Sequence, residues 1–302
     1  VKDVTYGLHV QNYGARTFTL NDCVMNNVDY PTYIQQKSTA KVTFKFNNVL
    51  GYKETINSGS NQAKYGKYVL TSTAAKLTNV ADDFNVTVSE DLADNGYVVE
   101  YNVENGVGTY SVVAGNIALE RNGEIVKKFA TIQDAINAAQ TGDKIVVLED
   151  VDLSTNQLVT LDNSFNTYFK VEGKAVTIDL NGKTINGEYA SSPMLVGLFS
   201  TDNNGHLTLE DSSDEKTGAV NVTTAEGYTV YALIANYEPG CSITINGGTY
   251  TLDKAHDSHI YSGSTNDGTQ GVTVNGGTFK LENVGTGLNG KPWMFNVLGS
   301  NH

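Results

Sequence analysis

A short phrase that alternates apolar and polar residues occurs four times in the second half of the chain. Each copy predicts one short strand that ends at an Asn, Asp or Gly corner. The copies are VTIDLNGKTI from Val176, HLTLEDSS from His206, SITINGGTYTL from Ser242 and VTVNGGTFKLE from Val272. Strand starts near 176, 207, 243 and 272 give steps of 31, 36 and 29 residues. Because one such unit cannot bury its apolar face alone, the repeat predicts copies stacked into a solenoid.

The apolar positions within each copy predict the core. They lie two residues apart, so each pair shares one face of its strand. We expect these side chains to point inward in stacked columns: Ile178, Leu180, Leu207, Leu209, Ile243, Ile245, Val272 and Val274.

Composition and charge narrow the classes of function. Thirty glycines and only four prolines among 302 residues suit many short strands joined by tight corners. The net charge of −13 argues against nucleic-acid and anionic-membrane partners. No apolar run approaches the roughly 20 residues that span a bilayer, so we expect no membrane insertion in this segment. Cys23 and Cys241 are far apart in sequence, which favours two buried free thiols over a disulfide.

Residues 129–142 predict the one convincing helix. Thr131 is a candidate N-cap with Asp134 three residues later, and Gly142 is a candidate stop. An apolar strand, residues 143–150, follows directly. We expect the helix, over residues 131–140, to cover the open apolar end of the solenoid and to block strand addition there. Its apolar face is formed by Ile132, Ala135, Ile136 and Ala139.

The segment FATIQDAINAAQTGDKIVVLEDVDLS, followed by VTIDLNGKTI, resembles the N-terminal cap and first coils of the pectate-lyase-like right-handed parallel β-helix. The likeness is greatest to the tandem modules of large bacterial surface proteins and extends from Phe129 to about Val297. It implies an all-β, right-handed parallel β-helix in two modules, the second capped by a short N-terminal α-helix.

A second, shorter repeat precedes this segment. Leu8-His-Val-Gln and Tyr33-Ile-Gln-Gln are about 24 residues apart, as are Phe18-Thr-Leu-Asn and Val42-Thr-Phe-Lys. Two alternating segments, Tyr97–Val103 and Thr109–Val113, flank Glu104-Asn-Gly-Val-Gly and predict a β-hairpin. Such a hairpin resembles the closing segment of these modules, and residues 116–128 are expected to be a short connector.

We therefore expect three regions. They are C-terminal coils of a first module (1–80), a hairpin with connector (81–128) and a second module with its cap helix (129–302). Because the first region lacks a cap helix and the last lacks a closing hairpin, we expect the chain to be an internal slice of a longer protein.

The sequence contains few of the residues that catalysis in this family would need. Lyases of this family use an arginine base, and the two arginines here, Arg16 and Arg121, lie outside the long face of the second module. The hydrolases of the family carry paired aspartates, Gly-His-Gly and Arg-Ile-Lys, and only a partial match occurs, near Asp202. Stacking of strands 195–201, 231–237 and 259–265 would place Asp202, Glu238 and Asp267 in one column, at the spacing that glycoside hydrolysis uses.

Metal ligands are also sparse. Residues 202–205 and 265–268 form oxygen-rich turns that suit Ca²⁺, but Asn/Asp/Gly turns make corners without an ion. His206, His256 and His259 lack the spacing of a transition-metal site. We expect no metal and no cofactor, with Ca²⁺ as the alternative.

Aromatic side chains give the best case for a ligand. Tyr189, Tyr231, Tyr237, Tyr261 and Trp293 lie at strand ends or loops, where rings beside polar groups suit glycans. Tyr250 and Phe279 are instead expected to stack inside the solenoid. The candidate ligand-binding residues are Asp202, His206, Tyr237, Glu238, His259 and Tyr261.

The sequence favours a non-catalytic structural or adhesive module on the outside of a bacterial cell, touching glycans or host surface molecules. Two alternatives stay open. One is a polysaccharide-degrading enzyme, a glycoside hydrolase or lyase, that uses Asp202 and Glu238. The other is a segment of a phage or virion fibre.

Overall fold

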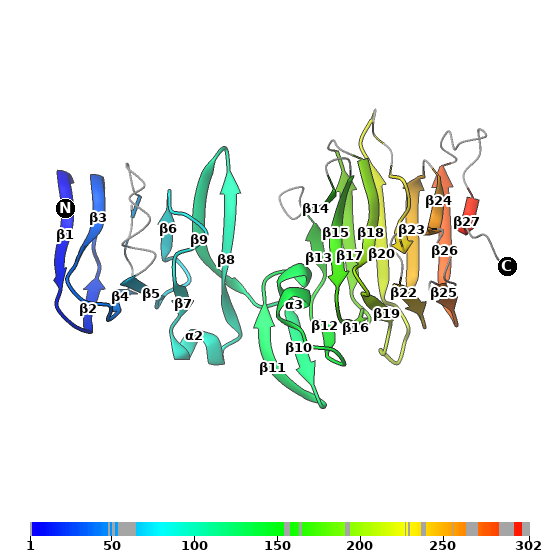
Figure 1. Ribbon diagram of the computed structural model, residues 1–302, viewed down its shortest axis with the longest axis horizontal. Coiled ribbons are helices and arrows are strands. Elements are labelled where there is room, and N and C mark those ends of the chain that lie inside the picture. Colours follow the sequence, from blue (N-terminus) through cyan, green and yellow to red (C-terminus); the bar gives the residue numbers. More distant parts are fainter. Residues whose placement is uncertain are drawn as a thin grey trace. The chain divides into compact units, whose positions relative to one another are not determined.

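The computed structural model of the chain describes residues 2–47, 49, 52–53, 65–153, 158–162, 165–190, 194–226, 228, 230–236, 240–255, 257–263, 271–283 and 293–297. Their secondary structure is almost entirely β (Figure 1). The chain is divided into two compact units, the N-terminal unit Val1–Gly115 and the C-terminal unit Asn116–His302. Among the described residues no helix is long and apolar enough to cross a membrane.

The C-terminal unit contains three sheets, and successive turns of the chain add one strand to each. The first sheet has the order β11 (Glu124–Phe129), β10 (Ile117–Arg121), β12 (Lys144–Val147), β16 (Ala175–Asp179), β19 (His206–Glu210), β22 (Ser242–Ile245) and β25 (Gly271–Val274). The second has β13 (Val151–Leu153), β17 (Thr184–Tyr189), β20 (Ala219–Thr224), β23 (Thr249–Lys254) and β26 (Thr278–Asn283). The third has β14 (Val159–Asp162), β15 (Phe165–Glu172), β18 (Met194–Asp202), β21 (Ile234–Asn236), β24 (Ser258–Ser262) and β27 (Trp293–Val297).

The four repeated phrases pair in parallel, as the sequence predicts. Val176 lies beside Leu207, Leu207 beside Ile243, and Ile243 beside Val272, which reproduces the steps of 31, 36 and 29 residues. Within Lys144–Val297 one pair of strands departs from the expectation of parallel pairing, because β14 is antiparallel to β15.

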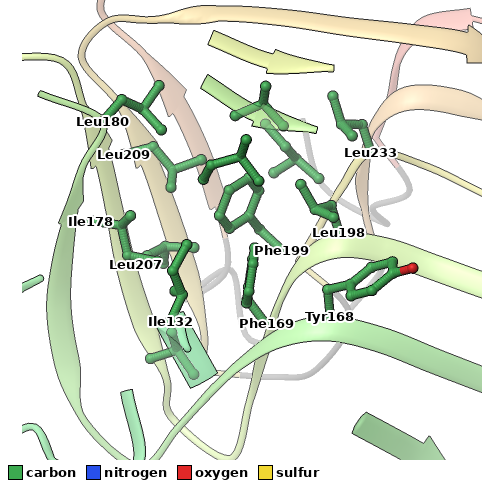
Figure 2. Close-up of a cluster of buried hydrophobic side chains, with 14 of the residues drawn as sticks. Ile132, Tyr168, Phe169, Ile178, Leu180, Leu198, Phe199, Leu207, Leu209 and Leu233 are labelled. Atoms are coloured by element: carbon green, nitrogen blue, oxygen red, sulfur yellow. The ribbon is translucent and has the colours of Figure 1, made fainter. Parts of the chain in front are cut away.

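Six of the eight predicted core side chains are fully buried. Figure 2 shows Ile178, Leu180, Leu207 and Leu209 from the first-sheet side facing Phe169 and Phe199 from the third sheet. Val272 and Val274 are the exceptions: Val272 is half-buried and Val274 is 40% exposed. Both lie on β25, the outer strand of its sheet within the described residues, so only β22 packs beside them.

The helix α3 (Ile132–Ala138) begins where the sequence predicts and ends earlier. Thr131 Oγ1 accepts a hydrogen bond from the Asp134 amide, at 3.1 Å, as a capping residue should. The expected apolar face is buried in the core of the unit. Gly142 does not terminate the helix, because the backbone is already extended at Ala139. The Lys174 ammonium caps this end by donating to the carbonyl oxygens of Ile136, Asn137 and Ala139 at 3.0–3.2 Å.

Residues 116–128 differ from the expected short connector. They form an antiparallel hairpin, β10–β11, whose turn at Asn122-Gly123 has positive φ at both residues. β10 pairs antiparallel with β12, so the hairpin covers the edge of the first sheet. This pairing explains why the unit begins at Asn116 rather than at the expected Phe129.

The N-terminal unit has a parallel pair, a parallel sheet and an antiparallel sheet. The pair is β1 (Lys2–Asn12) with β3 (Asn26–Gln36), and the parallel sheet is β2 (Arg16–Asn21), β4 (Val42–Asn47), β5 (Gly66–Leu70) and β7 (Val86–Val88). The antiparallel sheet is β6 (Lys76–Thr78), β9 (Val107–Ala114) and β8 (Tyr97–Glu104), and a short helix α2 (Glu90–Asp94) follows β7. The predicted hairpin is confirmed as β8–β9, turning at Asn105-Gly106. It pairs with β6, so it belongs to this unit.

The 24-residue repeat is confirmed for β1 and β3, where His9 lies beside Tyr33. The second expected offset is wrong by two residues. β2 and β4 pair Phe18 with Phe44, a step of 26 residues. An even shift keeps every side chain on the same face of the sheet, so the difference does not exchange the two faces of β4.

Candidate functional site

Asp202 lies at the end of β18, in a small network of charged side chains. Its register partner on β15 is Glu172. The Lys170 ammonium is 2.9 Å from a Glu172 carboxylate oxygen and 3.5 Å from one of Asp202. Lys170 holds the pKa of the Glu172 carboxyl below its usual range, so Glu172 is a poor proton donor at neutral pH.

An open groove of about 290 Å³ lies beside this network, between α3 and the third sheet. It is lined by Gln133, Ile136, Asn137, Val159, Lys170, Glu172 and Lys174. The Gln133 side chain holds the two elements together: its amide oxygen accepts from the Lys170 backbone N–H and its Nε2 donates to the Lys170 carbonyl, at 2.8 and 3.2 Å. Glu172 was not predicted as the neighbour of Asp202, because this pairing depends on the register of β15 and β18.

His206 follows Asp202 after a sharp corner and lies on a different sheet. Asn203 and Asn204 adopt positive φ, and the Gly205 amide donates to the Asp202 carbonyl at 2.9 Å. His206 begins β19 of the first sheet, where its Nδ1 is 2.8 Å from Ser242 Oγ. The corner therefore directs Asp202 and the exposed His206 into separate rows of side chains.

His259 and Tyr261 lie on β24 and are buried, 0% and 7% exposed. The His259 Nε2–H donates to the Tyr250 carbonyl at 3.0 Å, and burial lowers the pKa of His259 to about 4. Tyr261 packs edge-on against Tyr231, with ring centroids 5.2 Å apart. Both side chains are therefore packed inside the coil rather than presented to a ligand at the surface.

Some of the other candidates lie outside the described residues, and the remaining ones differ in burial. Tyr237 and Glu238, like His256 and Asp267, lie outside the described residues. Tyr189 is buried, whereas Trp293 is 37% exposed. The internal stack of Tyr250 on Phe279 is confirmed, with centroids 5.4 Å apart and an interplanar angle of 14°.

The remaining candidates are the metal-ligand turns and the two cysteines. Across the described ranges, no group of three or more His, Cys, Asp or Glu side chains is arranged to hold a metal ion. The turn at residues 265–268 lies outside those ranges. Cys23 and Cys241 are free, as predicted; Cys241 is buried and Cys23 half-buried.

Two features were not singled out from the sequence. One is a cluster of aromatic rings on β1 and β3, formed by Tyr6, His9, Tyr30 and Tyr33. The repeat carried a signal for it, because Tyr6 and Tyr30, and likewise His9 and Tyr33, recur at the 24-residue step. The other is Asp257, a fully buried carboxyl next to β24.

Comparisons with protein-family models, with curated proteins and with solved structures give no match to this chain.

Proposed function

We propose that the C-terminal unit is a right-handed parallel β-helix and that the chain is a non-catalytic structural or adhesive module at the outer surface of a cell. Its partners in this proposal are glycans or host surface molecules. The cyclic order of strands through three sheets supports the fold, as does the resemblance around Phe129–Val297. A crystal structure with left-handed coils would contradict it.

Regular columns of polar side chains on the outer faces carry the proposal of a binding role. Thr177, Thr208, Thr244 and Thr273 lie side by side on four neighbouring strands of the first sheet. On the second sheet, the amides of Asn186 and Asn221 are hydrogen-bonded at 3.2 Å, and Asn186 donates to Asp152 at 3.1 Å. Strands repeat at about 4.8 Å, so these columns form a rigid, regular surface of hydroxyl and amide groups. Such a surface suits multiple weak contacts with a repeating polymer such as a glycan.

The test is a glycan-array screen of the whole chain, run beside a polysaccharide-degradation assay with the same preparation. We expect binding to a restricted set of glycans and no cleavage products. Absence of binding to every glycan and host surface component tested would contradict the adhesive role.

One observation favours the second candidate, a polysaccharide-degrading enzyme. Asp202 and Glu172 are carboxylates on adjacent strands, next to the groove beside α3. Against it, glycoside hydrolysis needs one carboxyl with a raised pKa as the acid, and the pKa of Glu172 is lowered. Cleavage that is abolished by Asp202→Asn combined with Glu172→Gln or Glu238→Gln, but kept by Asp152→Asn, would establish the enzyme and overturn the adhesive module.

A further inference from the structure

The N-terminal unit presents a cluster of four rings on β1 and β3, formed by Tyr6, His9, Tyr30 and Tyr33 and called here the Tyr–His cluster. Tyr6 is at its centre, with its ring centroid 5.4 Å from Tyr30, 4.9 Å from Tyr33 and 5.9 Å from His9. Tyr6 is 47% exposed and His9 is exposed, while Tyr30 and Tyr33 are half-buried. The cluster is therefore a patch of aromatic surface open to solvent.

The backbone between the rings explains how residues three apart come to share a face. In a regular strand such residues point to opposite faces, yet the rings of Tyr6 and His9 touch, as do those of Tyr30 and Tyr33. Gly7 lies against Pro31, where a Cβ on Gly7 would be 2.7 Å from the Pro31 carbonyl oxygen. Gly7 permits this close approach, and Pro31 has no N–H for the strand ladder. We infer that both strands bend here and bring the four rings together.

The tyrosine hydroxyl groups of this cluster differ in their hydrogen bonding from those of the buried tyrosines in the same unit. The buried Tyr52 and Tyr68 hydroxyls both bond to Thr32 Oγ1, at 2.8 and 3.1 Å. Within the described part of the chain, the hydroxyls of Tyr6, Tyr30 and Tyr33 have no hydrogen-bond partner in the protein. Their polar groups are thus available at the surface, next to the ring faces.

We propose that the Tyr–His cluster is a binding site for a neutral pyranose sugar, an inference that rests on the proposed glycan-binding function and gives it a location. An exposed tyrosine ring stacks on the apolar C–H face of a pyranose, while phenol and imidazole groups hydrogen-bond to its hydroxyls.

The net charge selects this ligand over acidic sugars. The chain has a net charge of −13, which opposes uronic or sulfated sugars. A quaternary ammonium ion needs ring faces turned toward one point. Tyr6 and Tyr30 are stacked with planes 21° apart, so these two faces do not converge, whereas Tyr33 is tilted by 52° from Tyr6. Choline is therefore one of the probes in the experiment.

The experiment measures dissociation constants of the whole chain by calorimetry, and tyrosine ring shifts by NMR. The probes are neutral oligosaccharides of glucose, galactose, mannose and N-acetylhexosamines, with oligogalacturonate and choline for comparison. We expect Tyr6→Ala and Tyr33→Ala each to weaken neutral-sugar binding by about tenfold, the scale of a lost aromatic contact. Tyr6→Phe keeps the ring and should retain most of the affinity. Tyr13→Ala is the matched control, since Tyr13 is 70% exposed and outside the cluster.

The results of this experiment distinguish failure of the proposed site from failure of the proposed glycan-binding function. Neutral-sugar binding that is unchanged in Tyr6→Ala and Tyr33→Ala overturns the site and leaves the glycan-binding function standing. A wild-type chain that binds none of the probes, in a preparation with an intact melting transition, overturns both. Choline or oligogalacturonate binding that is lost in Tyr6→Ala, without neutral-sugar binding, overturns the ligand class.

Discussion

At the scale of single residues, His259 occupies a position that neighbouring coils fill with leucine. The Leu198 amide donates to the Leu233 carbonyl and the Leu233 amide donates to the His259 carbonyl, at 2.7 and 3.0 Å, so the three residues are at one level of successive coils. The His259 Nε2–H donates to the Tyr250 carbonyl, and its Nδ1 is buried without a hydrogen-bond partner among the described residues. Protonation of Nδ1 would place an unpaired charge in the core.

This arrangement predicts a loss of stability in mild acid. Burial lowers the pKa of His259 from its ordinary 6.5 to about 4. Between those values the unfolded chain binds a proton that the folded chain does not, so stability falls as the pH falls from 6.5 to 4. The shift corresponds to about 3 kcal/mol at roughly 1.4 kcal/mol per pKa unit. Urea unfolding at pH 7 and pH 4.5 should show a smaller loss for His259→Gln than for the wild type, whereas His206→Gln should follow the wild type. Equal losses in all three proteins would contradict a neutral buried imidazole.

Asp257 also has a buried polar atom that lacks a hydrogen-bond partner among the described residues. It is 0% exposed; its Oδ2 accepts from Asn296 Nδ2 at 2.7 Å, and its Oδ1 has no hydrogen-bond partner in the part of the chain that the structure describes. Asp257→Asn keeps the shape and an oxygen for Asn296 while removing a buried acidic group, so we expect it to stabilise the chain by about 1 kcal/mol. Denaturant midpoints measure the effect, with the exposed Asp152→Asn expected to stay within about 0.5 kcal/mol. A destabilised Asp257→Asn would show that the carboxylate has a favourable counter-charge.

At the scale of elements, the sequence predicts strands and their order better than it predicts their ends and edges. The repeated phrases are paired as predicted, because one inward face repeated in every coil leaves a single favourable register. The hairpin β10–β11 was missed although Asn122-Gly123 is a hairpin signal, because the resemblance assigned those residues to a connector. The residue that caps the C-terminal end of α3 is Lys174, 36 residues beyond Ala138 in the sequence, so no local pattern predicts this cap.

The candidate site was less predictable for the same reason. Asp202 lies at the end of a strand, as its column with later strand ends required, but its neighbours Glu172 and Lys170 come from the preceding coil at a step of about 30 residues. His259 was chosen as a polar residue among aromatics, and only the packing of Tyr250 and Phe279 shows that its ring is buried. The spacing of residues within a strand predicts which face a side chain is on. To predict its neighbours in the adjacent coil, one must also know how many residues lie in the loops between the strands.

The inward columns predict a large difference between two adjacent residues on β22. Ile245 is 0% exposed in the core, whereas Thr244 is half-buried in the outward column. Ile245→Asp should reduce the free energy of unfolding by at least about 4 kcal/mol, because it places an unpaired carboxylate in the core. Thr244→Asp should change it by less than about 1 kcal/mol. Circular dichroism melting of both variants decides the matter, and similar melting temperatures would show that the register of β22 is wrong.

At the scale of the whole molecule, each unit has its own hydrophobic core. The core of the N-terminal unit is centred on stacked rings, with Phe44 between Phe18 and Tyr68 at centroid distances of 5.8 and 5.3 Å. The core of the C-terminal unit is built of aliphatic columns closed by Ile132 of α3, as Figure 2 shows. A unit that buries its own apolar surface gains most of its stability internally.

Separate cores predict separate unfolding transitions. Phe44 and Leu209 are each 0% exposed, one in each core. Truncation of such a side chain to alanine lowers the free energy of unfolding by about 2–5 kcal/mol. We expect this loss in the unit that contains the resulting cavity. In calorimetry of the whole chain we expect two transitions, with Phe44→Ala lowering the midpoint of one and Leu209→Ala lowering the midpoint of the other. The double variant should show both shifts, added within about 0.5 kcal/mol, because the two residues belong to different core clusters. A single substitution that lowers both midpoints equally would mean that the units unfold as one cooperative body, and that the division at Gly115 has no thermodynamic meaning.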